Sequence, residues 1–294
     1  MILDKMMPRI YFLLKKVKYR KKINEFKEQL DKNKKFKGIH KNRRCFIIAN
    51  GPSVKELDFS CFENEIVFTV NQLVRKPDFE KLRTNYHIWA DRIFFEIDES
   101  NADDMEMLDV IKSVSRKSPK VEIFYEATAK PMVDKFGLEN SSNVNYFQVL
   151  GLNPDRMEKM FVDFTQPIAN YPTVVDYAIL LAVYMGFKEI YLLGCDCTGI
   201  INIAQNKLKN AKDNLYAFEM TDSAAKRLER YSKQRNIKDE LISQAIMFEK
   251  YEALDMYCKR NGAKLFNATE GGLLECIEHI NINNVLNNKE ENVR

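Results

Sequence analysis

Residues 45–53 read Cys45-Phe46-Ile47-Ile48-Ala49-Asn50-Gly51-Pro52-Ser53. The run of five apolar residues is typical of a strand that is buried in a parallel sheet. Asn50 and Gly51 tolerate positive φ, and Pro52 fixes its own φ. Ser53 can cap a helix that begins after the turn. Because a strand, a turn of small residues and a helix N-terminus together favour an anion, we expect this loop to hold a phosphate-bearing ligand.

Further apolar segments along the chain have the length and composition of strands. They are residues 66–70, 86–89, 121–125, 143–149, 189–193 and 263–266. Helical patterns occur between or after them, at 106–114, 172–185, 238–261 and 273–280. Strands that alternate with helices predict an α/β fold, in which a mainly parallel sheet has helices on both faces.

Polar residues follow several of these predicted strands. They are Asn50, Asn71, Asp91, Asp196 and Asn267. Each residue type is common in turns, but ligands of parallel sheets bind outside the carboxyl ends of the strands. Five such residues at strand ends therefore predict a binding site at this edge.

The charge of the chain is unevenly distributed. Residues 1–44 hold 16 Lys or Arg and 4 Asp or Glu, whereas the other 250 residues hold 30 and 38. An acidic body argues against a broad nucleic-acid surface. No apolar run approaches the roughly 20 residues that span a bilayer. The six cysteines lack zinc-site spacing, so we expect reduced thiols in a cytosolic protein and no metal.

The basic N-terminal segment, residues 1–38, has the pattern of an amphipathic helix. Leu3, Met6, Ile10, Leu13 and Val17 recur at helical spacing, and a cluster of lysines follows them. Such a helix suits an anionic membrane surface. Alternatively, its apolar stripe packs on its own domain or on another subunit of a homo-oligomer.

We therefore expect three parts along the chain. Residues 1–40 form a basic helical extension that ends in a polar linker at 32–41. Residues 41–284 form the α/β domain, in which the polar stretch at about 199–237 is a lid or a functional insertion. Residues 285–294 form a loose tail.

Four motifs, in order, resemble those of the Campylobacter-type bacterial sialyltransferases of lipooligosaccharide synthesis. They are Asn50-Gly51-Pro52-Ser53-Val54-Lys55-Glu56-Leu57-Asp58, Val70-Asn71-Gln72, Pro172-Thr173, and Gly186 to Asp196. The chain also resembles the broader DUF115 group, which includes motility-accessory-factor glycosyltransferases and archaeal 6-hydroxymethylpterin diphosphokinases. The ending Asn267-Ala268-Thr269-Glu270-Gly271-Gly272 is typical of the motility-accessory members. The resemblance covers roughly residues 43–282.

The resemblance implies a Rossmann-like α/β/α sandwich and a glycosyltransferase of surface glycan synthesis. Asn50, Gly51, Pro52 and Ser53, with Asn71, would then bind the nucleotide of a CMP-activated sugar, and Thr173 would lie near the donor phosphate or sugar. The sialyltransferases need no metal or other cofactor. A glycan or lipid-linked acceptor would place the protein in the cytoplasm, peripherally at the inner face of the cytoplasmic membrane.

The chain also departs from the sialyltransferase pattern. Their general base is a His in the lid, and no His lies between residues 198 and 237 here. Tyr171 replaces an Arg, Val174 replaces a Ser, and Thr198 replaces a Tyr. The nucleotide-binding half thus matches, whereas the sialic-acid half does not, and the donor sugar is left unassigned.

Three carboxylates are candidates for the base that deprotonates the acceptor hydroxyl. The first is Asp91, near Trp89, whose ring could raise the pKa of Asp91; its alternative role is a helix N-cap. The second is Asp196, whose alternative role is to tie two loops together. The third is Glu270, beside two glycines; its alternative is the first-turn acid of a C-terminal helix.

Two rival functions are open at this stage. A diphosphokinase that uses ATP would need Mg²⁺ held by carboxylates such as Asp91 and Asp196. A non-catalytic subunit would keep the sheet and bind a nucleotide sugar without a base, as the missing lid His suggests.

Overall fold

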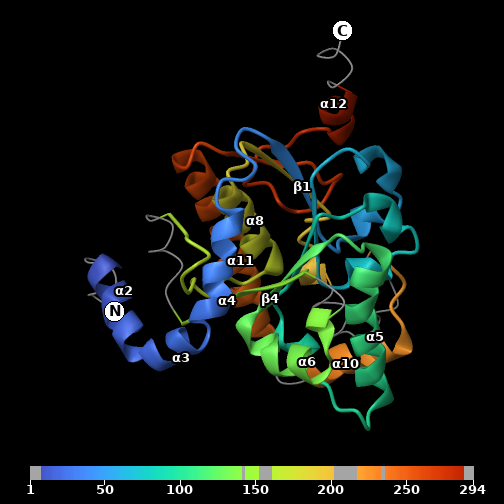
Figure 1. Ribbon diagram of the computed structural model, residues 1–294. Coiled ribbons are helices and arrows are strands. Elements are labelled where there is room, and N and C mark those ends of the chain that lie inside the picture. The colour runs from blue at the N-terminus through green and yellow to red at the C-terminus, as the bar shows by residue number, and fades with distance from the viewer. Residues whose placement is uncertain (1–7, 141–142, 152–160, 202–216, 233–235, 288–294) are drawn as a thin grey trace.

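The computed structural model of the protein describes residues 8–140, 143–151, 161–201, 217–232 and 236–287 (Figure 1). Its seven described strands form one sheet in the order β5-β4-β3-β2-β1-β6-β7, and all paired neighbours run parallel. The strands are β1 (Arg44–Ile48), β2 (Val67–Val70), β3 (Tyr86–Trp89), β4 (Glu122–Glu126), β5 (Asn143–Phe147), β6 (Glu189–Leu193) and β7 (Lys264–Asn267). Each predicted strand segment forms a strand, and the predicted Rossmann-like α/β/α fold is confirmed.

Strand β1 occupies a switch in the order of the sheet. After β1 the chain moves to β2 on one side, whereas β6 pairs with β1 on the other side and leads on to β7. In sheets of this kind ligands bind where the order reverses, outside the carboxyl ends of the two central strands. The topology therefore singles out the residues that follow β1 and β6.

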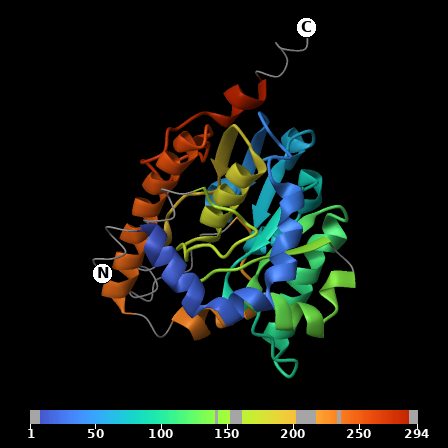
Figure 2. The same ribbon diagram turned by 60° about the vertical axis from the view of Figure 1, so that its left-hand side comes forward.

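Helices cover both faces of the sheet (Figure 2). The described α-helices are α2 (Pro8–Lys18), α3 (Arg20–Glu25), α4 (Lys27–Asp31), α5 (Ala102–Lys117), α6 (Lys130–Lys135), α8 (Val174–Met185), α10 (Asp222–Ser232), α11 (Ile237–Arg260) and α12 (Ile282–Asn287). One core lies between the sheet and α8 and α11, and the other lies between the sheet and α5 and α6.

Short 3₁₀ turns connect many of these elements. They are η1 (Lys32–Phe36), η2 (Pro52–Val54), η3 (Phe59–Phe62), η4 (Asn71–Arg75), η5 (Phe79–Leu82), η6 (Arg92–Phe94), η7 (Ala127–Ala129) and η8 (Leu138–Asn140). Within the described ranges, no helix is long and apolar enough to cross a membrane.

Helix α8 fixes one side of the site. All twelve of its residues are buried, as its apolar sequence predicts. Thr173 and Asp176 cap its N-terminus reciprocally, and Gly186, at φ 87°, ends it in the left-handed conformation that glycine tolerates. Because β6 follows Gly186 at the amino edge of the sheet, Thr173 lies at the carboxyl edge.

The N-terminal segment differs from a single helix followed by a linker. It is broken into α2, α3, α4 and η1. The expectation of a polar linker at 32–41 is wrong, because Asn33 and Phe36 are buried. The Asn33 side chain donates to the carbonyls of Tyr146, at 2.7 Å, and Phe164, at 2.9 Å. These bonds join the segment to the main core.

The C-terminal region also differs from expectation. Residues 273–280 do not form a helix, because their backbone returns alongside β7, where Asn267 N donates to the Glu278 carbonyl and Ile280 N donates to the Asn267 carbonyl. Residues 285–287 are not a loose tail but part of α12. Val285 is buried, and its carbonyl accepts a hydrogen bond from Arg44 at 2.9 Å. Residues 288–294 lie outside the described part of the chain.

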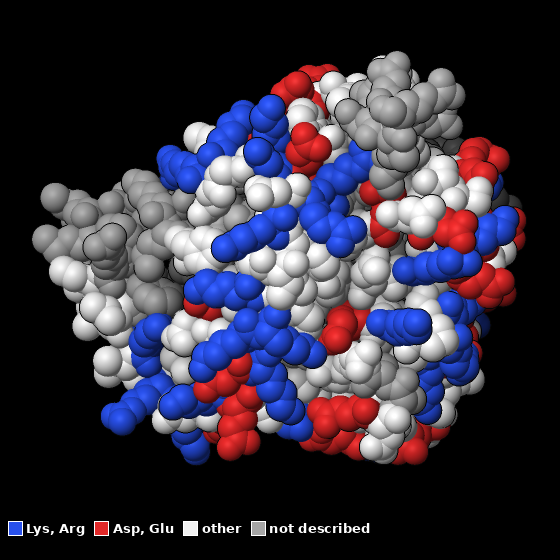
Figure 3. Space-filling view, turned by 45° about the horizontal axis from the view of Figure 1, so that its top comes forward, with Lys and Arg blue, Asp and Glu red and all other residues white. Residues whose placement is uncertain are grey.

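Of the expected lid at 199–237, residues 202–216 and 233–235 lie outside the described residues. The part that is described contains a helix, α10, rather than irregular chain. Lys and Arg side chains spread across the face that Figure 3 presents, with Asp and Glu side chains among them and along its upper, right and lower parts.

Candidate functional site

The loops that follow β1 and β6 are joined by Ser53 and Asp196. The backbone N–H of Ser53 donates to Asp196 Oδ1 at 3.1 Å, and its Oγ donates to Oδ2 at 2.8 Å. Gly51 N donates to the Gly194 carbonyl at 2.9 Å. A Cβ on Gly51 would lie only 1.8 Å from Asp196 Oδ2, so the close approach of the two loops requires glycine there.

This junction corrects the expectation that the N–H groups of the opening loop hold a phosphate. The N–H groups of Gly51 and Ser53 are already bound to residues of the β6 loop, and Val54 N donates to the Gly51 carbonyl at 3.2 Å. Pro52 has no N–H, and η2 is a single short turn. The buried carboxylate of Asp196 also disfavours an anion at this point.

The side chain of Asn50 carries an acceptor oxygen to which a ligand could donate a hydrogen bond. Its side-chain Oδ1 is buried and has no hydrogen-bond partner among the described residues. Its carbonyl accepts a hydrogen bond from Ala217 N at 3.0 Å, which joins the β1 loop to the expected lid. An unpaired buried acceptor is costly, and a ligand that donates an O–H or N–H would remove that cost.

Asn71 and Asp91 form a second pair, at the ends of β2 and β3. Asn71 Nδ2 donates to Asp91 Oδ2 at 2.8 Å. Asn71 has a positive φ of 45°, which asparagine tolerates better than most residues. Its Oδ1 is buried without a partner in the described part of the chain. Asn50 and Asn71 thus present two unpaired acceptor oxygens on neighbouring strand ends.

Asp91 as a residue is exposed, whereas protein atoms pack closely around its carboxyl group. The protein atoms around its carboxyl group desolvate it and raise its pKa, although the hydrogen bond from Asn71 opposes this shift. Its side chain makes no capping hydrogen bond to η6, contrary to the N-cap alternative. The ring of Trp89 packs into the core against Phe94 and His87, with centroids 5.3 and 5.1 Å away. A carboxylate with a raised pKa at the ligand-binding edge of the sheet is suited to act as a base.

Helix α8 packs against β3, the strand that ends just before Asp91. Tyr177, in the second turn of α8, has a raised pKa because of burial and then because of the negative charges of Asp176, Glu126 and Asp91. Thr173 N donates to Asp176 Oδ2 at 2.8 Å, and Asp176 N donates to Thr173 Oγ1 at 3.3 Å. The base candidate and the capped helix end thus both lie at the carboxyl edge of the sheet.

Two N–H groups at this helix end are not used by the capping box. An α-helix leaves its first N–H groups without intrahelical partners, and here those of Val174 and Val175 have none among the described residues. Asp176 itself is fully buried, and its Oδ1 has no partner in the same ranges. Burial raises the pKa of Asp176 to about 7. The N-terminus of α8 therefore keeps two N–H donors that η2 lacks, but the Asp176 carboxylate in the same turn opposes an anion there when it is ionised.

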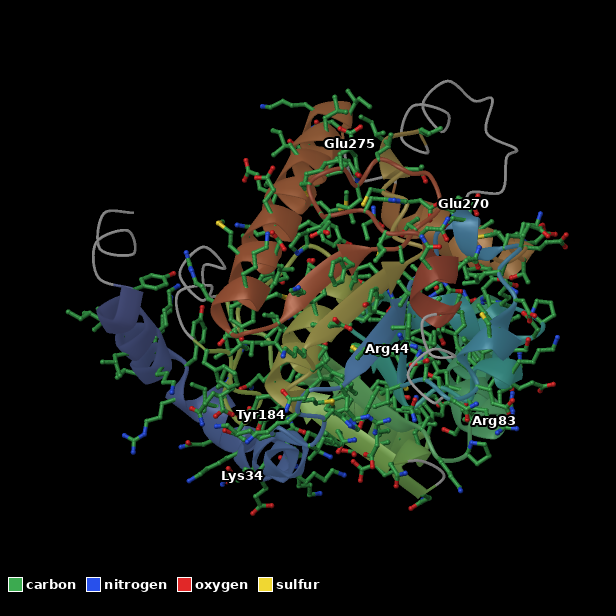
Figure 4. All side chains as sticks on the ribbon, turned by 90° about the horizontal axis from the view of Figure 1, so that it is seen from above. Lys34, Arg44, Arg83, Tyr184, Glu270 and Glu275 are labelled. Atoms are coloured by element: carbon green, nitrogen blue, oxygen red, sulfur yellow. The ribbon has the colours of Figure 1, made fainter. Side chains whose placement is uncertain are left out.

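The other two candidate bases lie differently. Asp196 is 5% exposed and both its oxygens are bound to Ser53, so the geometry favours its loop-tying role. Glu270 is exposed on the turn after β7, on the opposite side from Lys34 and Tyr184 in Figure 4. Leu273 N donates to the Asp196 carbonyl at 2.8 Å and holds this turn against the β6 loop. No C-terminal helix begins at Glu270, contrary to its alternative role.

The sheet order separates the two aspartates that a magnesium site would need. Asp91 follows β3 and Asp196 follows β6, with β2 and β1 between them. Three strand spacings amount to roughly 14 Å, too far for both carboxylates to bind one cation. Nowhere in the described ranges do three or more His, Cys, Asp or Glu side chains gather as a metal site.

Some residues that shape the site were not recognised in the sequence. Asp176 could have been recognised. A threonine that is followed three residues later by an acidic residue, as Thr173 is by Asp176, is the signature of a capping box. Arg227 gave no local signal, because it binds the Ile93 and Glu96 carbonyls, which lie 134 and 131 residues away. Asn267, by contrast, is structural, because its side chain is bound to Leu274 and Thr269.

Comparison with known proteins gives a similarity among solved structures only. No protein-family model and no curated protein sequence matches the chain. Among solved structures it is similar to the sialyltransferase CstII from Campylobacter jejuni in complex with a substrate analogue, cytidine-5′-monophosphate. The two chains are 20% identical, the match covers 82% of this chain and 85% of the other, and the TM-score is 0.43.

Proposed function

We propose that the protein is a metal-independent glycosyltransferase of bacterial surface glycan synthesis that uses a nucleotide-activated, CMP-linked sugar as donor and a glycan or a lipid-linked molecule as acceptor. The observation that carries this proposal is the Asn71–Asp91 pair. It places a carboxylate of raised pKa beside an unpaired amide oxygen, at the edge where the sheet binds ligands. The motif resemblance of the sequence supports the same reaction class.

The nucleoside would bind at Asn50 and Asn71. Their unpaired Oδ1 atoms accept hydrogen bonds, and ribose hydroxyls and the cytosine amino group supply donors. A rigid loop suits this task, and the Ser53–Asp196 junction holds the loop of Asn50 in place. These two asparagines thus favour a ligand rich in O–H and N–H groups over a bare anion.

The donor phosphate would lie at the N-terminus of α8. The N–H groups of Val174 and Val175 and the helix dipole favour the negative charge that grows as the nucleotide leaves. Thr173 caps this turn and would lie beside the phosphate. Leaving-group stabilisation of this kind requires no metal.

Asp91 would act as the general base. Its carboxylate takes the proton of the acceptor hydroxyl while the acceptor oxygen attacks the anomeric carbon of the donor. The bond from that carbon to the phosphate oxygen breaks, and CMP leaves with the electron pair. Attack opposite the leaving group inverts the anomeric centre. A raised pKa makes Asp91 a stronger base than an ordinary aspartate near neutral pH.

The rival functions have less support. The separation of Asp91 from Asp196 disfavours the shared Mg²⁺ of a diphosphokinase. A non-catalytic subunit has no need for a carboxylate that is held by a neighbouring amide. Binding and turnover measurements separate the three functions.

The decisive experiment combines nucleotide binding with turnover. Thermal-shift titration should show stabilisation by CMP or CDP without metal. A mixture of labelled CMP-sugars should yield CMP release by the wild type, with a loss of about 10²- to 10⁴-fold in Asp91→Asn at unchanged CMP affinity. Glu99→Gln, which changes a surface ion pair near Asp91 in sequence, is the control and should turn over normally. Stabilisation by ATP only with Mg²⁺, and none by cytidine nucleotides, would exclude this function.

The proposal includes an anionic membrane surface as partner, reached through α2. Ile10, Leu13, Leu14 and Val17 are 45%, 60%, 55% and 74% exposed. Lysines and arginines follow this stripe at once, as anionic lipid requires.

The placement of α2 suits a lipid-linked acceptor. In the following helix, the Lys22 carbonyl accepts a hydrogen bond from Gln148, just past the carboxyl end of β5, at 2.9 Å. Helix α3, which follows α2, therefore lies toward the same edge of the sheet as Asn71 and Asp91. Binding of α2 to the inner face of the cytoplasmic membrane would turn this edge toward the bilayer.

A further inference from the structure

The described end of the expected lid is bound to two loops of the candidate site. We call residues 217–232, which include α10, the strap. At its start, Ala217 N donates to the Asn50 carbonyl at 3.0 Å, and the Ala217 side chain is buried. In α10, Arg227 reaches the loop that follows β3. The strap thus connects the end of β1 with the end of β3.

Arg227 makes an unusually complete set of bonds for a surface helix. Its side chain is 4% exposed. Nε donates to the Ile93 carbonyl at 3.1 Å, and Nη2 donates to the Glu96 carbonyl at 2.9 Å and also to that of Ile93. Nη1 forms a buried ion pair with Asp104 in α5. The guanidinium thereby binds the Ile93 and Glu96 carbonyls of the loop after β3. It also links this loop to α5, the helix that follows the loop.

The bonded loop carries Asp91. The Asp91 carbonyl accepts from Phe94 N at 3.0 Å, so Asp91 and Ile93 belong to one tight turn, η6. At the far end of the loop, Asp98 N donates to Asp104 Oδ2 at 3.1 Å. Arg227 and Asp104 therefore hold the loop at both ends, and Figure 1 shows α10 beside α5.

We propose that Arg227 is a positioning residue, which holds the loop of residues 91–98 so that the Asp91 carboxylate stays beside Asn71 and faces the bound donor. The proposal rests on the proposed function for its kinetic readout. A planar guanidinium can bind two carbonyls and a carboxylate at once, whereas the ammonium group of lysine cannot reproduce this fork. Loss of the fork would free the loop while the positive charge stays.

The first test compares Arg227→Lys with Arg116→Lys. Arg116 of α5 also forms an ion pair, with Asp109. The side chains of both residues in this pair are exposed. In Arg227→Lys, kcat for CMP release should fall about 10- to 100-fold, because small displacements of a reacting group are costly. CMP affinity should stay within about 2-fold of the wild type, and Arg116→Lys should behave as wild type.

The second test does not depend on turnover. Surrounding protein raises the pKa of Asp91, while Asn71 lowers it and Tyr177 lies nearby on α8. Carboxyl-carbon NMR titration should show the pKa of Asp91 falling toward its ordinary value in Arg227→Lys, because the freed loop admits water and the charge is retained. The amides of Phe94 and Asp98 should exchange at least about tenfold faster in this variant.

The outcomes distinguish failure of this proposal from failure of the proposed function. A wild type that releases no CMP refutes the glycosyltransferase, and the titration and exchange measurements then decide the role of Arg227 alone. An unchanged Asp91 titration with unchanged exchange overturns the positioning role. Loss of CMP binding and kcat in parallel with a lowered unfolding midpoint overturns it as well, because Arg227 would then serve only the general stability of the fold.

Discussion

The carboxylate of Asp196 accepts two hydrogen bonds from Ser53, at 3.1 Å from the backbone N–H and 2.8 Å from Oγ. The pair joins the loops after β1 and β6 where the order of the sheet reverses. The Ser53 N–H and hydroxyl groups could otherwise have bound an anion. Because they donate to Asp196 instead, the loop is held in place but its N–H donors are occupied. In the proposed function, this loop orients Asn50 and the N-terminus of α8 supplies the donors for a phosphate.

Replacement of Asp196 by alanine should destabilise the protein and weaken nucleotide binding together. Two donors of Ser53 lose their acceptor in a largely buried setting, which costs about 1–3 kcal/mol of unfolding free energy. The measurements are urea unfolding and titration calorimetry with CMP. Asp58→Ala is the matched control, because Asp58 binds Ser60 N and Oγ at 3.0 and 2.7 Å in an exposed turn. CMP affinity that is unaltered in Asp196→Ala would show that the loop is not part of the nucleotide site.

Two substitutions at Asn71 separate its side-chain role from its backbone role. Asn71→Gly keeps the positive φ and removes the amide, so stability should change little while CMP affinity falls about 5-fold. Loss of the hydrogen bond to Asp91 also raises the pKa of that carboxyl further, so the acid limb of kcat/KM should move to higher pH.

Asn71→Ala should show the same binding and pH effects and an additional loss of stability. Alanine is strained at a φ of 45°, which costs on the order of 1 kcal/mol. The measurements are calorimetry, pH–rate profiles and urea unfolding of both variants. An acid limb that stays in place in both would contradict Asp91 as the base.

The strands and their polar ends were predictable, because buried parallel strands are short apolar runs and turn residues follow them. The helix expected at 273–280 was not found, although Leu273, Leu274 and Ile277 have helical spacing. The backbone of this segment instead bonds to Asn267 of β7. A sequence pattern reports which side chains are buried, but not which distant backbone groups compete for the N–H and carbonyl groups.

The same limit explains the loop after β1. Asn50 to Ser53 has the composition of an anion cradle, and the residue that occupies its N–H groups, Asp196, lies 143 positions from Ser53. Asp196 was noted for its place at a strand end, and its loop-tying role was one of two alternatives. Only the packing of β6 against β1 decides between them.

Asp176 should give the unfolding free energy a distinctive pH dependence. Its pKa is about 7 in the folded protein, well above that of an unfolded aspartate, so the folded state binds the proton more tightly. This contribution to stability is complete below the unfolded pKa, near 4, and is lost as pH rises through about 7. Asp176→Asn should remove the loss, because the amide carries no charge and its oxygen can still accept from Thr173 N.

Urea unfolding of the wild type and Asp176→Asn between pH 5 and 8 measures this effect. The difference in unfolding free energy between the two proteins should change by about 2.5 kcal/mol over this range, in favour of the variant at high pH. Asp134→Asn is a suitable control, because Asp134 pairs with Lys130 on an exposed surface. A difference that does not vary with pH would mean that Asp176 is already ionised in the folded protein.

Polar substitution of the α2 stripe should release the protein from anionic membranes. In the fourfold variant Ile10→Ser, Leu13→Ser, Leu14→Ser and Val17→Ser, sedimentation with phosphatidylserine-containing vesicles should fall at least about tenfold, because exposed apolar side chains drive insertion while the lysines are retained. Binding of the wild type should also weaken as salt is raised. Ile242→Ser on α11, where the side chain is 47% exposed, is the control and should bind as wild type. Equal sedimentation of all three proteins, or a change of oligomeric state in the fourfold variant alone, would identify the stripe as a protein-packing surface instead.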